Sequence, residues 1–331
     1  MAKKKKKAKE DTPQMLKRKA KKTVIGIFLG ALIAGLCFTM LYPIFKLFPN
    51  VTSDLTDLGN PDVIWIPINR SLMSFEAAYT FIMEEGIMTM VSSLAYAAGI
   101  TLVQIVVSAM VGYALARVDF PGAKIIFMLV LFAFLVPPQA LLLSQYIHFK
   151  NFDILGIFTM LTGGTIDLIN KPVTLFLLAL LGFGVNQSLF VFIFRQFFKG
   201  TPKELEEAAL IDGCGFHRTY LSIMVPNAKP AIATVAVLGF VWNYGDTYYT
   251  GYFHPDGPYL GHILTTTFQS ANEYFILEAM QEWYHLPMAS SFVFDAVKQA
   301  GALIYMIPLL IVYFVAQKWL VENIENAGIV G

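Results

Sequence analysis

Six long runs of uncharged, mostly apolar residues alternate with polar segments along this chain. The runs occupy residues 23–45, 86–116, 125–147, 172–194, 230–245 and 299–317. A helix needs about 20 mostly apolar residues to cross a membrane, with a range of about 17–25. The fifth run is short, but it continues to residue 253 beyond a single Asp246. The pattern predicts an all-α polytopic membrane protein with six transmembrane helices.

The polar segments predict how the chain is divided. We expect a basic tail, a membrane domain and a short C-terminal tail at residues 1–22, 23–320 and 321–331. Prolines in segment 46–85 favour extended or turn structure there, followed by a short helix at 74–85. Gly182 and Gly184 suggest that the fourth run, 172–194, forms a flexible or broken helix.

Lys and Arg residues predict the orientation, because cytoplasmic loops are enriched in them. With the N-terminus in the cytoplasm, inner segments hold 19 of the 24 Lys and Arg residues; these segments are 1–22, 117–124, 195–229 and 318–331. The N-terminal tail dominates this count, but the other residues divide in the same direction. Both termini are therefore expected in the cytoplasm. The basic tail is expected to lie near anionic lipid rather than to bind nucleic acid.

Composition and motifs exclude several classes of function. Charged residues make up 14% of the chain and hydrophobic residues 56%, which does not suit a soluble protein. The sequence has no G-x-x-x-x-G-K-[ST] segment and therefore no phosphate-binding loop. Its histidines lack metal-ligand spacing, and no catalytic constellation is visible, so we expect neither a metal site nor an enzyme. The six runs also lack the acidic or His residues that a proton-driven transporter needs.

A polar loop at residues 200–226 carries a strong local structural signal. Thr201 is predicted to cap a helix whose first turn holds three glutamates, which suit its positive end. Ala208 and Ala209 follow, and their small side chains allow another surface to approach closely. A stiff polar loop between two apolar spans is expected to dock onto another protein.

The end of this first helix is also predicted. Gly213 suits a left-handed conformation, which terminates a helix. A second helix should begin near Gly215 or Phe216 and lead to Pro226. The loop is therefore predicted to be a short hairpin of helices.

The same loop resembles a known pattern: E-A-A, three residues, Gly, nine residues, then I-x-L-P, with Val in place of Leu. The matching positions are Glu207, Ala208, Ala209, Gly213, Ile223, Val225 and Pro226. The pattern is typical of membrane subunits of binding-protein-dependent ABC importers, and it implies the type I importer permease fold. It further implies that the loop is a coupling helix in a cleft of an ATPase subunit. There Glu207 would pair with a basic residue, while Asp212 lies on the side of the helix that carries Leu205, Ala208 and Ala209.

Other segments resemble the MalG-type carbohydrate importer permeases. They begin at Tyr113, Phe120, Val136, Phe194 and Trp242, and end with the small-residue tail 327–331. The resemblance covers about residues 86–253 and 300–331, whereas segments 148–175 and 254–298 are longer than usual. The implied function is ATP-driven import of a sugar or oligosaccharide.

This resemblance also implies a location and partners. The chain would lie in the bacterial plasma (inner) membrane with a MalF-type second permease subunit, two nucleotide-binding ATPase subunits and an extracellular substrate-binding protein. ATP and Mg would bind to the ATPases, so this chain needs no cofactor. Gly328 and Gly331 in the C-terminal tail would contact the ATPase pair.

Four residues are candidates for the substrate pathway. Asn186 and Gln187 lie near the middle of the fourth run, where polar side chains face either a pathway or a neighbouring helix. Trp242 and Asn243 lie near the end of the fifth run, where sugar contact and an interfacial aromatic belt are both open. A charged solute such as a glycerophosphodiester is the alternative substrate. It would need basic residues along the path, and the six runs contain none.

Overall fold

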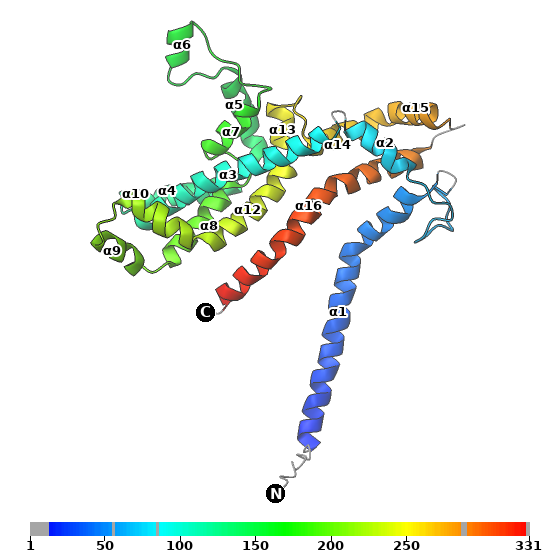
Figure 1. The fold of residues 1–331 in the computed structure, drawn as a ribbon, viewed down its shortest axis with the longest axis horizontal. Coiled ribbons are helices and arrows are strands. Elements are labelled where there is room, and N and C mark those ends of the chain that lie inside the picture. The colour runs from blue at the N-terminus through cyan, green and yellow to red at the C-terminus, as the bar shows by residue number, and fades with distance from the viewer. Residues whose placement is uncertain (1–12, 55–56, 84–85, 286–289, 329–331) are drawn as a thin grey trace. The chain divides into compact units, whose positions relative to one another are not determined.

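The computed structural model describes residues 13–54, 57–83, 86–285 and 290–328 (Figure 1). This described part is helical, with two isolated β-bridges. Its contacts divide the chain into two units, the first containing residues 1–75 and 290–300, and the second 76–289 and 301–331. The all-α prediction is confirmed.

The first unit contains the whole of α1 (Pro13–Thr52) and the first residues of two other helices, α2 (Met73–Ile82) and α16 (Ser291–Gly328). Helix α1 continues through Pro43 and Pro49, beyond the predicted end of the first span. An apolar environment favours this continuation, since backbone groups there need internal partners. The helix also begins inside the predicted tail, while residues 1–12 lie outside the described residues. Helix α2 agrees with the predicted short helix.

The second unit is organised around α3 (Ile87–Arg117), which packs against three other helices (Figure 1). They are α7 (Pro172–Leu180), α8 (Gln187–Gly200) and α12 (Lys229–Tyr244). A Cβ atom on Gly112 of α3 would lie 2.7 Å from Phe194 Cβ and 2.9 Å from the Arg195 backbone nitrogen. Small residues permit such close helix contact in membrane proteins, where packing drives association.

Three predicted spans are not single straight helices. The predicted span 125–147 comprises α4 (Ala123–Leu135) and α5 (Pro138–Lys150), bent by 102°. Span 172–194 divides into α7 and α8, which confirms the expected break. Span 230–253 divides into α12 and α13 (Tyr248–Phe253).

Each break has a local physical cause. Pro137 and Pro138 lack the N–H groups that a continuing helix needs. Gly182 and Asn186 both have positive φ angles, 88° and 52°. The Asp246 carboxylate accepts hydrogen bonds from the backbone N–H groups of residues 248, 249 and 250, so it starts α13 as a new helix.

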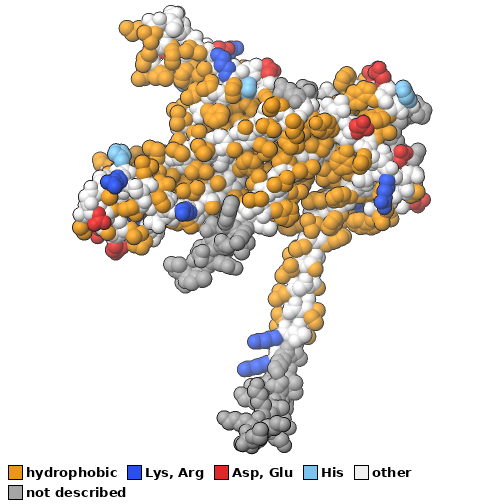
Figure 2. Space-filling view, viewed as in Figure 1, with side chains coloured by type: hydrophobic (Ala, Val, Ile, Leu, Met, Phe, Trp, Pro, Cys, Tyr) orange, Lys and Arg blue, Asp and Glu red, His pale blue; other side chains and the backbone are white. Residues whose placement is uncertain are grey.

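Among the described helices, α1, α3 and α16 contain segments long and apolar enough to cross a membrane. The number of candidate spans rises to at most five if each of two bent helix pairs counts as one span; the pairs are Ala123–Leu135 with Pro138–Lys150 and Phe216–Asn227 with Lys229–Tyr244. Figure 2 shows hydrophobic side chains over most of the visible surface along the helices of the second unit. Charged side chains gather at the end of this unit that carries the loop between α8 and α12.

Short helices build the two longer-than-usual segments. They are α6 (Ile157–Thr162), α14 (Leu260–Thr267), η2 (Ser270–Asn272) and α15 (Glu273–Tyr284). The segment before α14 is tied to α3, because the Leu260 backbone N–H donates to the Ser93 hydroxyl at 2.7 Å. The Ser93 hydroxyl lies 3.3 Å from the Pro258 carbonyl oxygen. One end of α3 is therefore bonded to this segment.

Candidate functional site

The loop between α8 and α12 is a compact helical hairpin. It contains α9 (Glu204–Ile211), α10 (Phe216–Thr219), the π-helix η1 (Tyr220–Met224) and α11 (Val225–Asn227). Gly213 has a φ of 82°, as predicted, and its backbone N–H donates to the Leu210 carbonyl at 3.1 Å. The second helix begins at Phe216, also as predicted. We call residues 201–227 the coupling hairpin.

The predicted cap at the start of the hairpin is wrong. Helix α9 begins at Glu204, with Lys203 before it and no side-chain cap. Thr201 instead belongs to the end of α8, where its hydroxyl and its backbone N–H both donate to the Phe197 carbonyl at 3.1 Å. The preceding helix extends far enough to use the hydrogen-bonding groups of Thr201. The acidic first turn of α9 is present as expected.

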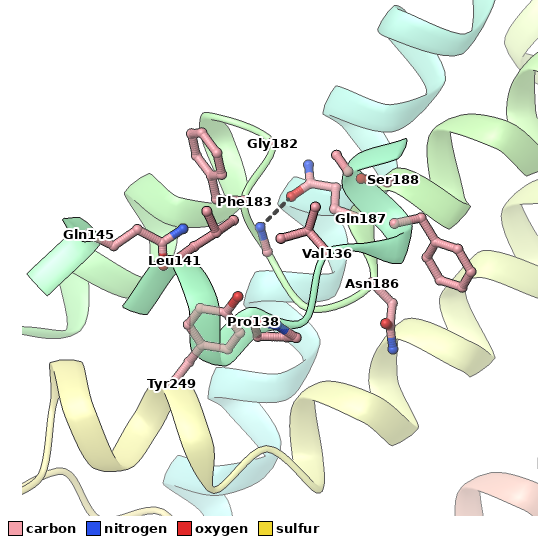
Figure 3. A pocket seen from close by; sticks show the side chains of 13 residues that line it. Val136, Pro138, Leu141, Gln145, Gly182, Phe183, Asn186, Gln187, Ser188 and Tyr249 are labelled. Atoms are coloured by element: carbon pink, nitrogen blue, oxygen red, sulfur yellow. Dashed lines mark hydrogen bonds between the residues drawn. The ribbon is translucent and has the colours of Figure 1, made fainter. Parts of the chain in front are cut away.

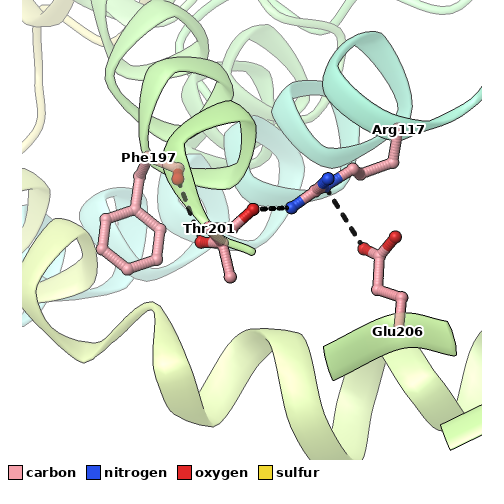
Figure 4. A network of polar contacts seen from close by, with 4 residues as sticks. All are labelled: Arg117, Phe197, Thr201 and Glu206. Atoms are coloured by element: carbon pink, nitrogen blue, oxygen red, sulfur yellow. Dashed lines mark hydrogen bonds and ion pairs between the residues drawn. The ribbon is translucent and has the colours of Figure 1, made fainter. Parts of the chain in front are cut away.

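An ion pair attaches the coupling hairpin to α3 (Figure 4). Arg117 Nε at the end of α3 lies 3.4 Å from Glu206 Oε1, and these side chains are only 5% and 18% exposed. The Arg117 Nη2 group also donates to the Thr201 carbonyl. One guanidinium therefore joins α3, the end of α8 and the first helix of the hairpin. Sequence reasoning used Arg117 and Glu206 only as parts of a motif and a charge pattern.

Aromatic packing makes a second attachment. The buried Tyr113 ring of α3 lies 5.4 Å from Phe198, 5.4 Å from Phe216 and 4.9 Å from Tyr220, measured between ring centroids. Aromatic pairs within 4.5–7 Å stabilise their packing beyond simple burial. Tyr113 thus joins α3 to α8 and to both parts of the second hairpin helix.

The motif residues divide between an inner and an outer face. Ala209 is 3% exposed and Ile223 is half-buried, so both pack inward. The exposed motif residues are Glu207, Ala208, Gly213 and Pro226. Asp212, which lies beside the motif glycine, is also exposed.

Large apolar side chains accompany the outward-facing members. They are Leu205, Leu210, Ile211, Phe216 and Leu221, with Ile211 86% exposed. Exposed apolar groups rimmed by polar residues mark protein–protein contact surfaces.

Two of the predicted pathway residues hold helices together. Gln187 is 1% exposed, and its amide donates to the Ala179 carbonyl at 2.7 Å and accepts from the Gly184 N–H at 3.0 Å. Asn243 is also 1% exposed, and its Nδ2 lies 2.7 Å from Gln104 Oε1 and 3.1 Å from Thr101 Oγ1. For Gln187 these bonds are of the helix–helix kind that the sequence left open. For Asn243 the sequence left open a sugar contact or an aromatic belt, and the structure instead bonds its amide to α3.

Gln104 was missed as a member of this network. Its Nε2 donates to the Val185 carbonyl in the break between α7 and α8. The available signal was a lone amide inside an uncharged run, where polar side chains need partners.

The remaining predicted residues occupy different surroundings. Trp242 stacks on Phe190 at 5.6 Å between ring centroids, beside the buried core. Asn186 is exposed and lines a pocket at the span breaks. Gly328 is the last residue of α16, and Gly331 lies outside the described residues.

His254 and His262 lie just before and within α14. Among the described residues, no group of three His, Cys, Asp or Glu side chains is arranged to hold a metal ion. His254 Nδ1 lies 2.7 Å from the Tyr259 hydroxyl. Burial lowers the pKa of both His254 and His262, which favours neutral imidazoles.

Residues 104–326 match the family described as binding-protein-dependent transport system inner membrane component. The chain belongs to this family. The matched segment includes both the coupling hairpin and Arg117.

Individual relatives support the carbohydrate resemblance. The permease is 32% identical over 67% of its length, and 68% of the relative's, to the probable starch degradation products transport system permease protein AmyC of Thermoanaerobacterium thermosulfurigenes. It is 26% identical to the arabinooligosaccharides transport system permease protein AraQ of Bacillus subtilis, over 96% and 100% of the two chains. It is 25% identical to the sn-glycerol-3-phosphate transport system permease protein UgpE of Brucella abortus, over 94% and 98%.

The fold has a counterpart among solved structures. A crystal structure of a bacterial ABC transporter involved in the import of the acidic polysaccharide alginate contains a chain with a TM-score of 0.65. The alignment covers 90% of the permease and 97% of that chain, at 19% identity. The permease therefore has the type I ABC importer fold that its hairpin predicted.

Proposed function

We propose that this permease is the membrane subunit of an ATP-driven importer that moves a neutral sugar or oligosaccharide into the cell. The observation that carries the proposal is the coupling hairpin, which is bonded firmly to α3 but exposes Glu207 and several large apolar side chains. A loop that is fixed to the membrane helices on one face and exposes a binding surface on the other is suited to transmit a movement from a partner protein to those helices. Within this proposal, ATP and Mg bind to two ATPase subunits docked at this surface.

The proposed complex contains two further components. A second, MalF-type permease subunit would complete the pore, and an external binding protein would deliver the substrate. The permease would lie in the inner membrane of a bacterium. The asymmetry of its basic residues places the hairpin and both termini on the cytoplasmic side. The C-terminal residues Gly328 and Gly331 are proposed to contact the ATPase pair.

Two observations support a sugar as the substrate. AmyC and AraQ are named for starch degradation products and arabinooligosaccharides. Asn186, the pathway candidate that remains exposed at the pocket, carries an amide side chain, which suits sugar hydroxyls. The relative named for sn-glycerol-3-phosphate makes a phosphorylated solute the second candidate.

A purification from native membranes tests the assembly. A tagged permease should co-purify with a second permease and an ATPase, both identified by mass spectrometry. Changing Leu210 and Ile211 together to Asp should remove the ATPase but keep the second permease, because only the hairpin surface is altered. The matched control changes Leu155 and Met160 to Asp. These side chains are 96% and 90% exposed, and they lie on another segment.

Either of two results would contradict the proposal. One is a Leu210→Asp, Ile211→Asp complex with its ATPase fully retained. The other concerns substrate class and uses the wild-type complex in liposomes. ATP-driven uptake of labelled sn-glycerol-3-phosphate without uptake of maltotriose or arabinotriose would replace the sugar with the phosphorylated solute.

A further inference from the structure

Two of the span breaks and the start of α13 meet at one pocket (Figure 3). Its walls come from the α4–α5 break, the α7–α8 break and the first turn of α13. The lining residues are Ala133, Phe134, Val136, Pro138, Leu141, Gln145, Gly182, Phe183, Gly184, Asn186, Gln187, Ser188 and Tyr249. Broken membrane helices leave irregular backbone that is tolerated only where it is buried in protein or lines a cavity. Transporters commonly place substrate sites at such discontinuities.

Most polar groups exposed by the breaks are satisfied within the chain. Gln187 bonds to backbone groups on both sides of the α7–α8 break, at Ala179 and Gly184. Asp246 accepts from the first N–H groups of α13. The breaks themselves therefore do not require further polar side chains in the pocket.

One side chain in the pocket remains unsatisfied. The Oε1 atom of Gln145 is buried and has no hydrogen-bond partner among the described residues. Gln145 lies on α5, and Figure 3 shows it beside Leu141 and on the same side of the pocket as Tyr249. A buried acceptor without a donor is destabilising, so a hydroxyl group that reached this side chain would stabilise this wall of the pocket.

The pocket suits a small neutral ligand with several hydroxyl groups. None of its thirteen lining residues is charged. Its volume is about 140 Å³. A water needs about 10–15 Å³ of such space, so the pocket has room for roughly ten non-hydrogen atoms. That size corresponds to one sugar ring.

We propose that this pocket is a saccharide subsite of this chain. The inference rests on the proposed sugar-import function and specifies where this subunit touches the sugar. The Gln145 amide hydrogen-bonds to a sugar hydroxyl, and the Tyr249 side chain contacts an adjacent face or hydroxyl of the ring. Asn186 and Ser188 supply further hydrogen-bonding groups at the α7–α8 break. The exclusion of charge makes the subsite unfavourable for a phosphorylated solute.

The test uses the assembled complex in nanodiscs, with its binding protein and labelled maltotriose or arabinotriose. A photoreactive benzoylphenylalanine replaces Tyr249, and in a matched complex it replaces Tyr252, which is 48% exposed on the same helix and outside the pocket. Irradiation during ATP turnover should attach saccharide to position 249 at least tenfold more than to position 252. Equal labelling at the two positions would overturn the proposal.

A second variant tests the unsatisfied amide. Gln145→Leu should reduce saccharide uptake about tenfold while the complex still assembles. Gln139→Leu, on an exposed position of α5 outside the pocket, should transport normally. Normal uptake by Gln145→Leu would overturn its assigned role, and if this variant fails to assemble, the labelling comparison still decides.

The results separate this inference from the proposed function. Transport of either saccharide without selective labelling at position 249 rejects the subsite and leaves the importer intact. Transport of sn-glycerol-3-phosphate alone rejects the sugar function, and with it the subsite.

Discussion

At the scale of single residues, the left-handed turn at Gly213 determines the shape of the coupling hairpin. Its φ is 82°, and a Cβ atom there would meet nothing within 4 Å. A substitution would therefore act through backbone strain and not through a clash. The left-handed region costs most residues about 1–2 kcal/mol, and β-branched residues adopt it only as outliers.

We predict that Gly213→Val lowers the thermal stability of the complex and reduces substrate-stimulated ATP hydrolysis severalfold. Gly215 provides the control, since it also has open space around its Cβ position but a φ of −72°. Gly215→Ala should leave both properties near wild type. Melting temperature and ATPase rate in nanodiscs are the measurements, and equal behaviour of the two variants would show that the left-handed turn is unimportant.

The residue scale also shows what the sequence could and could not predict. Gly213 was predictable because its role depends on neighbours a few positions away. Thr201 was mispredicted because it can either cap the start of α9 or bond to the end of α8. The sequence pattern did not show that α8 would extend far enough for its Phe197 carbonyl to accept from Thr201. The pairing of Arg117 with Glu206 was missed because it joins residues far apart in the chain, and only the packing of α3 against the hairpin reveals it.

At the scale of elements, the breaks within spans define the candidate pathway. Counting apolar residues predicted where spans lie but not where they bend. The hydropathy of a run is the same whether its backbone forms one straight helix or two helices at an angle. The glycines at 182 and 184 did indicate the α7–α8 break. The Pro137–Pro138 pair carried a similar signal in the third run, where the sequence pattern had suggested one helix.

The packing of Gly184 leads to a prediction about the α7–α8 break. A Cβ atom there would lie 2.3 Å from Gln104 Nε2 and 2.7 Å from Gln187 Oε1. Gly184→Ala should therefore disturb the amide network and destabilise the fold by about 1–3 kcal/mol, the usual cost of overpacking. Differential scanning fluorimetry should show a lower melting temperature than for Gly164→Ala, where the added Cβ meets nothing within 4 Å. Identical melting temperatures would mean that the network tolerates the added methyl group.

At the scale of the whole molecule, orientation is the property that the sequence predicts and labelling can decide. In a background with Cys37 and Cys214 changed to Ser, we would introduce single cysteines at Asp62, Asn272 and Lys203, all exposed positions. The first two should react with a membrane-impermeant thiol reagent in intact cells, because they lie in predicted outer segments. Lys203 lies in the coupling hairpin and should react only after the cells are opened. The reverse pattern would place the hairpin outside and remove its proposed role.

Helix α3 is bonded at both of its ends, and this has a thermodynamic consequence. Arg117 and Tyr113 attach one end to the coupling hairpin, while Ser93 near the other end is bonded to the segment around Leu260. With 31 residues at about 1.5 Å each, α3 spans roughly 46 Å. At Gly112, α3 also packs closely against α8. Linkage is reciprocal. If nucleotide bound to an ATPase docked at the hairpin alters the affinity of the segment around Leu260 for a partner protein, that partner alters the affinity for nucleotide by the same factor.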